Sequence, residues 1–535
     1  MRSSIVALAV LALGFAAAGS SSTGGSAARQ GQPRSVDAGL VQAKAQAAIS
    51  ALAPAFTSHV DCASHAHAAN VKLDCDTILP NNEPHIAVDP ANPRHMVASS
   101  NDYDSCCDEF YTTFNGGRSW TTGEMSAQAD ATGSDPVTSF DVKHDTVLHA
   151  SLNYFFTEFG EATNGDVVVS RSKDGGITWK EPVVVYNGHG ADSDRTQVFN
   201  DKEWIGTDNN PDSPFYGRTY LTWSRFLSHF GGYNESPIWE SHSDDGGRSW
   251  SRAQEISGSN SQFCTFQLAG ADGQCDEDQA STIAIGPDGT VSVAFINEQH
   301  EDAWEPDEIF ENQYMVVQST DGGRNWSKPV HVVDLEDGSL DYPFNVDGAQ
   351  TLTGYQVRVW GVGGITVNPT TGALYLVFSD NRLGTHDVDE PVTDTKAFLM
   401  RSADGKSWDG PELVDPSGGD QWFPWADVNP TNGEVGILYN HRFRDDANGY
   451  HATLATGAPG AFTTREVSTD TSNPVRSLFF QAGIPECELC SVFHGDYIGL
   501  AFGSDGIANG VWTDMRNTRF NNLHLEFIYF DRWSP

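Results

Sequence analysis

The stretch Ser172-Lys-Asp-Gly-Gly-Ile-Thr-Trp179 is one of several copies of an eight-residue pattern, Ser-x-Asp-x-Gly-x-x-Trp. Complete copies also begin at Ser243 and Ser319, and incomplete copies occupy residues 113–120 and 402–408. An Asp carboxylate accepts hydrogen bonds from the backbone N–H groups of its own turn, and Gly adopts a positive φ without steric cost. The pattern therefore predicts a repeated tight turn that joins two strands of a hairpin.

The closing Trp of each copy carries a large apolar face, which we expect to be buried between neighbouring sheets. Because the turn uses its own polar groups, we expect the Asp and Trp residues to be structural rather than catalytic. We also expect the Trp side chains to lie on the face opposite the binding site. The residues concerned are Asp174, Trp179, Asp245, Trp250, Asp321 and Trp326.

A second repeat combines an apolar strand, a turn and a second strand that ends in polar residues. Its first strands lie at residues 86–90, 137–142, 204–208, 282–287, 365–369, 425–430 and 497–502. Short strands that alternate with Gly, Pro and Asn turns predict all-β architecture. With each unit forming a four-stranded blade, the sequence predicts a β-propeller, in which seven blades are favoured and six are the alternative.

The N-terminal residues precede the repeats and differ from them in composition. Arg2 is followed by an apolar run from Ile5 to Ala18, which is typical of a secretory signal peptide over residues 1–19. Residues 20–60 are rich in Ser, Gly, Ala and Gln and are expected to be a low-complexity leader before a propeller at 61–535. No apolar run is long enough to span a membrane. We expect the protein to be secreted, extracellular or periplasmic.

The chain is strongly acidic, with 31 Lys and Arg, 72 Asp and Glu and a formal net charge of −41. Such a surface repels nucleic acid and anionic membranes, so we expect neither as a partner. We expect a monomer that binds a carbohydrate.

Eight cysteines in an exported chain favour disulfides over free thiols. Proximity in the sequence suggests the pairs Cys62–Cys75 and Cys264–Cys275. The remaining four are Cys106, Cys107, Cys487 and Cys490. They flank the first and last blades, which are neighbours in a closed ring, so we expect these four to lie close together.

The octapeptide is the Asp box, or BNR repeat, and through it the chain resembles the sialidase superfamily over about residues 80–533. Other glycosidases and several non-enzymatic propellers also carry this repeat. Sialidases have six blades, hold the substrate carboxylate with three arginines, and use a Tyr activated by a Glu together with an Asp acid/base. The Arg-Ile-Pro motif that opens the first sialidase blade is replaced here by Asn82-Glu83-Pro84-His85.

Propeller geometry predicts where the site lies. Residues just before each first strand and just after each second strand gather around the axis, on the face opposite the octapeptide turns. The first group is Glu83, Asp135, Asp201, Glu203, Asp278, Gln421, Asp496 and Tyr497. The second group is Asp102, Asn153, Arg225, Glu298, Asp380, Arg382, His441, Arg442, Asp514 and Arg516. A mouth lined in this way predicts a sugar-binding cleft, with ion pairs between blades as the alternative.

Three arginines, Arg382, Arg442 and Arg516, occupy equivalent positions in three consecutive blades. A fork of guanidinium groups binds a carboxylate bidentately, so the resemblance implies that these three bind an acidic sugar. Asp380, Asp514 and Asp496 are their expected partners without ligand. Further substrate-binding candidates are Arg225, Asp201, Trp422 and His441. Trp422 and Trp425 either stack on sugar rings or are buried between blades.

Tyr497, beside Asp496, is the candidate nucleophile or base, with Glu203 or Glu298 as its partner. The histidines His85, His441 and His494 lack a metal-ligand spacing. We expect no required cofactor, and metal binding is unassigned. Two acidic loops, Asp102-x-Asp104 and residues 272–278, are candidates for a structural Ca²⁺.

These observations favour a secreted, sialidase-like glycoside hydrolase acting on a glycan that contains acidic sugars. One alternative is a polysaccharide lyase, in which an Arg neutralises a uronate carboxylate while Tyr or His moves the proton. Another is a non-catalytic propeller that binds glycan or protein, because the fold alone does not fix function.

Overall fold

The computed structural model describes residues 69–534, except 75–79, 104–106, 129–130, 157–161, 189–195, 230–231, 268–269, 301–310, 339, 345–348, 388–389, 443–448, 475–476, 478–492, 517–518 and 521–522. The predicted signal peptide and leader lie outside these residues, as do Cys62, Cys75, Asp104, Cys106, Cys487 and Cys490.

The described residues form seven antiparallel sheets of at least four strands, which are the blades of a propeller. Blade 1 consists of β2 (Asn81–Asp89), β3 (Asn92–Asp102), β4 (Asp108–Thr113) and β5 (Thr121–Glu124). Blade 2 consists of β6 (Thr132–Asp141), β7 (Thr146–Phe156), β8 (Ala162–Ser172) and β9 (Val183–Tyr186). Blade 3 consists of β10 (Thr196–Thr207), β11 (Thr219–His229), β13 (Ile238–Ser243) and β14 (Gln254–Glu255), with β12 (Gly232–Glu235) added beside β11.

The other four blades repeat this order. Blade 4 consists of β15 (Asp278–Ile285), β16 (Val291–His300), β17 (Glu311–Ser319) and β18 (Val330–Asp334). Blade 5 consists of β19 (Gly364–Val367), β20 (Leu374–Asp380), β21 (Lys396–Ser402) and β22 (Asp409–Leu413). Blade 6 consists of β23 (Gln421–Val428), β24 (Val435–His441), β25 (His451–Gly457) and β26 (Thr463–Glu466). Blade 7 consists of β27 (Gly499–Phe502), β28 (Ala508–Asp514), β31 (Phe527–Trp533) and β1 (Val71–Lys72).

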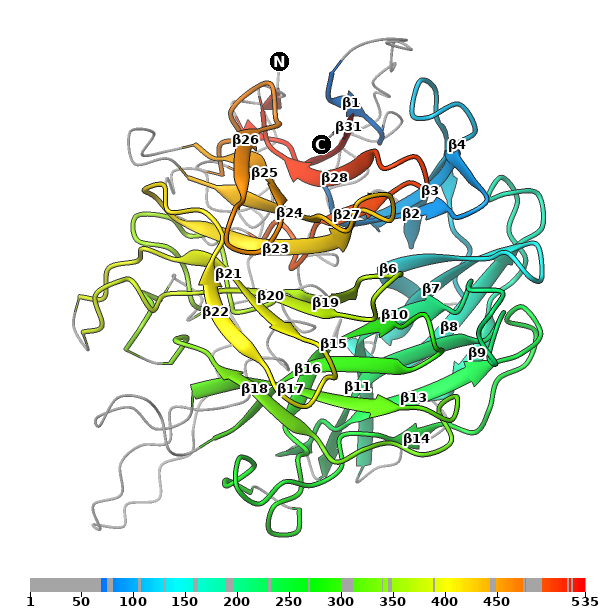
Figure 1. Cartoon of the computed structure of the whole chain (residues 1–535), viewed down its shortest axis with the longest axis horizontal. Coiled ribbons are helices and arrows are strands. Elements are labelled where there is room, and N and C mark those ends of the chain that lie inside the picture. The colour runs from blue at the N-terminus through cyan, green and yellow to red at the C-terminus, as the bar shows by residue number, and fades with distance from the viewer. Residues whose placement is uncertain are drawn as a thin grey trace, which may run out of the picture.

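The first strands of consecutive blades contact one another around the whole ring, including β27 of blade 7 with β2 of blade 1. The colours of Figure 1 accordingly run once around the molecule, and β1 lies beside β31. The all-β propeller with seven blades, rather than six, is therefore confirmed. Among the described residues, no helix is long and apolar enough to cross a bilayer.

The ring is closed by a strand that the sequence analysis did not assign. The N-terminal β1 pairs antiparallel with the C-terminal β31, with Val71 opposite Phe530 and Lys72 opposite Tyr529. Val71 packs against the same apolar cluster as Ile528 and Phe530. The two ends of the chain thus complete one blade together.

The octapeptide turns have the hydrogen bonds that the sequence predicts. In blade 2, Asp174 Oδ1 accepts from the backbone N–H groups of Ile177 at 3.2 Å and Thr178 at 2.9 Å, and the Gly176 N–H donates to Ser172 Oγ at 2.8 Å. Gly176 has φ +91°, and a Cβ there would lie 2.8 Å from Val97 Cγ2 of blade 1. Only Gly fits this contact between blades.

The Trp of each turn packs toward the preceding blade, as expected. The Trp179 ring lies 5.7 Å from the Phe110 ring of β4, centroid to centroid. Trp179, Trp250 and Trp326 are, however, only partly buried. The expectation that these indoles are buried is therefore confirmed only in part.

Disulfide bonding follows the sequence prediction where it is described. Cys264 and Cys275 are bonded, with their Cα atoms 5.3 Å apart. Cys107 is also disulfide-bonded, and none of the described cysteines is free. The pair Cys62–Cys75 and the clustering of Cys107 with Cys106, Cys487 and Cys490 stay predictions.

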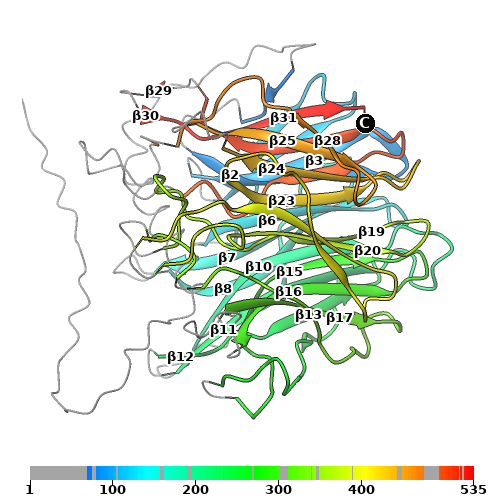
Figure 2. The same ribbon diagram turned by 60° about the vertical axis from the view of Figure 1, so that its left-hand side comes forward.

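Two blades carry additional strands after their second strand. These are β12 in blade 3 and the hairpin of β29 (Arg519–Phe520) and β30 (Leu523–His524) in blade 7. In Figure 2 they lie on the same side of the molecule.

Candidate functional site

A shared backbone irregularity marks the axial end of the first strands. In β2, β6, β10, β15 and β23 the strand register shifts within the first few residues, which is a β-bulge. Each bulge contains one non-Gly residue with positive φ: Glu83 (56°), Asp135 (59°), Lys202 (52°), Ala280 (53°) and Phe423 (53°). Such bulges redirect side chains, and positive φ is unfavourable for these residue types. The same strained bulge therefore recurs near the start of the first strand in five of the seven blades.

Three of these bulges bring charged side chains together at the axis. Glu83 of blade 1, Asp135 of blade 2 and Lys202 of blade 3 interact electrostatically with one another and with Asp496, which precedes β27. Asp201, beside Lys202, interacts with Asp135 and Asp496 and with both cations, Lys202 and Arg358. We call Glu83, Asp135, Asp201, Lys202 and Asp496 the axial cluster. All five are buried.

Glu83 is the most constrained member of the axial cluster. Its Oε2 accepts from Asn101 Nδ2 at 2.8 Å, and its Oε1 accepts from the backbone N–H of Asp496 at 3.0 Å. Burial raises the pKa of Glu83 well above its usual range, and the negative charges of Asp135 and Asp496 add to this effect. A Cβ on Gly495, which has φ +88°, would lie 2.5 Å from Glu83 Cγ. The loop before blade 7 is thus fitted against Glu83.

Lys202 supplies a positive charge among these carboxylates. Its Nζ lies 3.3 Å from the centre of the Tyr497 ring and has no hydrogen-bond partner within the described residues. A cation over an aromatic face is stabilised by the ring quadrupole. Burial lowers the pKa of Lys202, whereas the Coulomb attraction of Asp135, Glu83 and Asp496 opposes that shift.

The sequence-predicted catalytic residues fall into two groups. Tyr497, Asp496 and Glu203 lie in or beside the axial cluster, and burial raises the pKa of both Tyr497 and Glu203 well above their usual ranges. The Tyr497 hydroxyl donates to the Pro136 carbonyl. Neither carboxylate oxygen of Glu203 accepts a hydrogen bond from another described residue. Glu298 is separate from them: it is half-buried and accepts from Gln279 within blade 4.

Arg358 provides the second cation at the axis, and sequence reasoning missed it. It lies in the long connection between β18 and β19, is almost completely buried, and forms an ion pair with Asp496 through Nη2. Its guanidinium also lies over the Phe493 ring, 4.8 Å from the centroid. Because this connection has no counterpart in the repeat, no repeat-based comparison singles Arg358 out. Lys202 was also missed, although its neighbours Asp201 and Glu203 were both identified.

The three arginines expected to form a carboxylate fork have separate partners. Arg382 pairs with Asp380 (Nη2–Oδ2, 2.6 Å), Arg516 pairs with Asp514 (Nη2–Oδ2, 2.6 Å), and Arg442 pairs with Asp420. Each also lies over an aromatic ring of its own: Phe398, Tyr529 or Tyr355. The expected partners Asp380 and Asp514 are confirmed. Asp496 instead forms an ion pair with Arg358. No described residue is an ion-pair partner of two of these arginines, so their joint role in substrate binding stays a prediction.

The remaining substrate-binding candidates have structural contacts. Arg225 Nε donates to the Tyr186 hydroxyl at 2.9 Å, and its guanidinium lies over the Trp239 ring. His441 is buried, its Nε2 lies 3.2 Å from the Gly418 carbonyl oxygen, and burial lowers its pKa. Trp422 is also fully buried, which leaves no ring face for a sugar. Of the two alternatives for Trp422 and Trp425, burial between blades is therefore the observed one.

Two histidines near the axis, the buried His494 and the half-buried His85, are held by hydrogen bonds to neutral groups. Trp422 Nε1 donates to His494 Nε2 at 3.1 Å, and the other ring nitrogen of His494 lies 3.3 Å from the Tyr450 hydroxyl. His85 Nδ1 accepts from the Thr138 backbone N–H at 3.2 Å. Burial lowers the pKa of each of these histidines to about 3. They are therefore neutral, and the acceptor nitrogen of each is already occupied.

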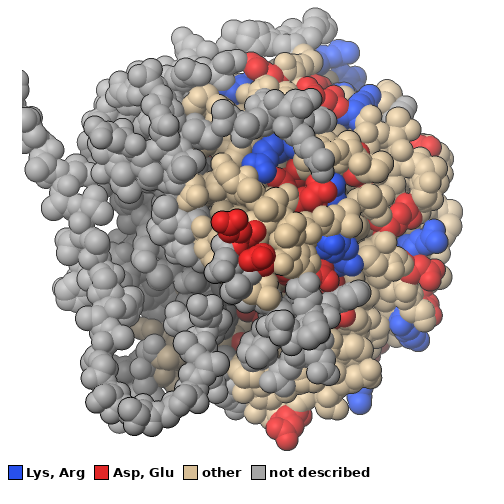
Figure 3. Space-filling model, turned by 90° about the vertical axis from the view of Figure 1, so that its left-hand side faces the viewer, with Lys and Arg blue, Asp and Glu red and all other residues tan. Residues whose placement is uncertain are grey.

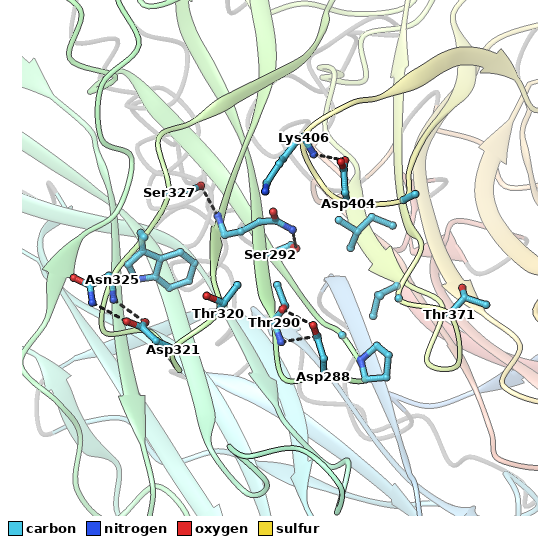
Figure 4. A pocket seen from close by; sticks show the side chains of 18 residues that line it. Asp288, Thr290, Ser292, Thr320, Asp321, Asn325, Ser327, Thr371, Asp404 and Lys406 are labelled. Atoms are coloured by element: carbon cyan, nitrogen blue, oxygen red, sulfur yellow. Dashed lines mark hydrogen bonds between the residues drawn. The ribbon is translucent and has the colours of Figure 1, made fainter.

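The opposite face has a groove of about 590 Å³ between the turns of blades 4 and 5 (Figure 4). Its carboxylates are satisfied by their own turns: Asp288 accepts from Thr290, Asp321 from Asn325 and Asp404 from the Lys406 backbone N–H. Among the described residues, the carboxylates of this groove are therefore occupied in holding their own turns. On the face shown in Figure 3, basic and acidic side chains are interspersed over the described surface.

No family model and no curated protein sequence matches this chain. Similar solved structures include the GH93 α-L-arabinofuranosidase of Fusarium graminearum, at 10% identity, covering 74% of this chain and 98% of that chain, with a TM-score of 0.44. A PL25 ulvan lyase is 11% identical, with 86% and 95% covered and a TM-score of 0.44. The NanB sialidase of Streptococcus pneumoniae is 9% identical, with 82% and 83% covered and a TM-score of 0.41.

Proposed function

We propose that this protein is a glycoside hydrolase whose catalytic centre is the axial cluster. The observation that carries the proposal is the convergence of Glu83, Asp135, Asp201 and Asp496 from four blades, three of them from strained or glycine-assisted backbone. Glycoside hydrolysis generally needs two carboxyl groups, one protonated and one charged. Such a pair arises where the environments of two neighbouring carboxyl groups push their pKa values apart.

Glu83 is the general acid. Its raised pKa favours the protonated carboxyl, which is the form that donates a proton to a leaving oxygen. Asp496, ion-paired with Arg358, is the charged carboxylate that activates water or attacks the sugar. Lys202 offsets the negative charge of the cluster and, with Tyr497, excludes water from its floor.

Neutral sugars fit this centre better than acidic ones. The acidic-sugar expectation rests on Arg382, Arg442 and Arg516, whose guanidinium groups are already paired with carboxylates. At the axis Lys202 already interacts with the carboxylates of the axial cluster and Arg358 is ion-paired with Asp496, so both cations are engaged before any anionic substrate could bind. The signal-peptide pattern of residues 1–19 supports export, so the proposed substrate is a glycan outside the cytoplasm.

The lyase alternative has less support from the same geometry. It needs a Tyr or His that takes up a proton, whereas His85 and His494 have occupied acceptor nitrogens. Burial also raises the pKa of Tyr497 well above its usual range, which opposes formation of the phenolate that would act as a base.

The test is a panel of neutral oligosaccharides, sialosides and uronic-acid polysaccharides, with reducing-sugar release and ultraviolet absorbance as readouts. We expect reducing-sugar release from a neutral glycan, and a loss of at least about 100-fold in kcat in Glu83→Gln. Glu124→Gln, which removes an exposed carboxylate from β5 of the same blade, is the matched control and should retain activity.

Three results would reject the proposal. They are hydrolysis unaffected by Glu83→Gln, an unsaturated product absorbing in the ultraviolet, and binding without turnover across the panel. The second result would support the lyase and the third a non-catalytic binding propeller.

A further inference from the structure

Blade 5 contains a second convergence of polar side chains, away from the axial cluster. Glu336 and Asp341 lie in the connection between β18 and β19, and His386 lies in the connection between β20 and β21. One ligand atom from each side chain lies within 4.8 Å of the other two. His386 Nδ1 is 3.2 Å from Asp341 Oδ1 and 3.6 Å from Glu336 Oε2.

The orientation of the His386 ring is fixed from its far side. Its Nε2 lies 3.0 Å from the Asn381 backbone carbonyl oxygen, so Nε2 carries the hydrogen and donates it. In the neutral ring the lone pair of Nδ1 then faces two carboxylates. A backbone carbonyl that holds the outer ring nitrogen is the usual support of a metal-binding histidine.

Asp341 is fully buried, and its two oxygens have different environments. Oδ2 accepts from the Gly338 backbone N–H at 2.6 Å, whereas Oδ1 accepts no hydrogen bond from the described residues and faces His386 and Glu336. A buried carboxylate oxygen without a hydrogen bond is costly. A cation between the three side chains would satisfy it together with the Nδ1 lone pair.

We infer that Glu336, Asp341 and His386 bind a divalent transition-metal ion of the Zn²⁺ type. Four ligands placed tetrahedrally about 2.1 Å from Zn²⁺ are about 3.4 Å apart, which matches the two separations measured here. An imidazole nitrogen with two carboxylate oxygens suits Zn²⁺ or Mn²⁺, whereas Ca²⁺ prefers oxygen ligands alone. Three protein ligands leave a position for water on the side of His386 that is partly exposed.

The surrounding contacts indicate a structural role for this ion. The Glu336 backbone N–H donates to Asp380 Oδ2 at 3.1 Å, and Asp380 is held by Arg382. Asn381 Nδ2 donates to the Asp341 carbonyl at 2.5 Å. The ion would therefore join the β18–β19 connection to the end of β20. The same connection carries Arg358, so the ion stabilises the segment that places a cation at the axis.

The experiment uses the untagged full chain, treated with chelator and then titrated by calorimetry with Zn²⁺, Mn²⁺ and Ca²⁺ separately. We expect about one Zn²⁺ per chain, a rise in Tm on binding, and much weaker binding of Ca²⁺. Asp341→Asn and His386→Gln should each weaken Zn²⁺ binding at least about 100-fold. His331→Gln, which alters a His–Asp pair of blade 4 without a second carboxylate, should bind Zn²⁺ as the wild type does.

Several outcomes would overturn the assignment. They are the absence of Zn²⁺ and Mn²⁺ binding to the wild type, Ca²⁺ binding tighter than Zn²⁺, and Zn²⁺ binding that survives His386→Gln. The first outcome would leave an ion pair between a charged His386 and the two carboxylates. If Asp341→Asn fails to fold, the partly exposed His386→Gln variant and the wild-type stoichiometry still decide the question.

Discussion

The octapeptide turns and the axial cluster are both rich in carboxylates. The two regions differ in which residues interact with those carboxylates. Asp174 lies in an exposed turn where Thr178 and Ser172 donate to it; although partial burial would raise its pKa, these hydrogen bonds hold the value at about 2. Glu83 lies at the axis, where burial and neighbouring negative charges raise its pKa. The first carboxylate depends on residues up to four positions away, whereas the second depends on residues from three other blades.

This difference indicates which carboxylates serve the fold and which serve a site. A group satisfied within its own turn can be repeated in every blade without affecting its neighbours. A group whose surroundings include residues of several blades requires those blades to be assembled, and such costly arrangements are found mainly at functional sites.

The largest expected effect comes from removing the buried cation of the axial cluster. Lys202→Met keeps most of the side-chain volume but leaves Glu83, Asp135 and Asp496 without their shared positive charge. We expect the free energy of unfolding at pH 8 to fall by about 3–5 kcal/mol, as for breaking a buried ion pair. Urea denaturation measures it. Lys406→Met, in the exposed turn of blade 5, should change stability by less than about 0.5 kcal/mol. Equal effects of the two variants would remove the distinction between the regions.

The next effect is a pH dependence of stability. Burial raises the pKa of Glu526 from 4.5 to about 8, and its oxygens accept from Ser477 and Asn82 beside the axial cluster. Between these two pH values the folded protein keeps a proton that the unfolded chain loses, so stability decreases as pH rises through this window. We expect Tm, followed by circular dichroism, to decrease from pH 5 to pH 8. Glu526→Gln should flatten the decrease, and an unchanged slope would contradict the assignment.

A smaller effect is expected from the indole of an octapeptide turn. Trp250 is partly buried against the preceding blade, so Trp250→Ala should lower the free energy of unfolding by about 2–3 kcal/mol, at or below the lower end for fully buried Trp. Catalysis by the folded fraction should be unchanged, because the turn lies on the opposite face. Loss of turnover in fully folded Trp250→Ala protein would mean that this turn is coupled to the axis.

The smallest effect separates the geometry of the turn from its charge. Asp245 Oδ1 accepts from the backbone N–H groups of Arg248 and Ser249 at 2.9 Å each. In blade 1, Asn115 makes the equivalent bonds at 3.0 Å each with a neutral amide. Asp245→Ala should therefore cost about 1–2 kcal/mol, and Asp245→Asn less than about 0.5 kcal/mol, by urea denaturation. A large cost for Asn would show that the charge matters.

The fold was predictable because its determinants are local and repeated. The octapeptides and the paired strands located all seven blades, and the disulfide Cys264–Cys275 followed from proximity. The same reasoning found Glu83, Asp135, Asp201 and Asp496, because every blade places its first strand in the same way.

Most of the residues that the sequence did not predict lie in segments without a counterpart in the other blades. Arg358 and the triad Glu336, Asp341 and His386 lie in connections that no other blade shares. The equivalent positions of Arg382, Arg442 and Arg516 in the repeat also suggested one shared fork of guanidinium groups, whereas each arginine has a separate ion-pair partner. Each equivalent position has its own aspartate, and this pairing within a blade dominates any attraction between blades.

The pairing of β1 with β31 sets the order in which this molecule can be completed. Among the described strands, the one that closes the last blade is synthesised first and its partner is synthesised last. Until the C-terminal residues are available, β1 has no edge to join, and without β1 the open edge of β31 can pair with another chain. Contacts between the two ends of a long chain form slowly. The step that completes the propeller is therefore also the one most exposed to misassembly, and a truncation at either end removes the same blade edge.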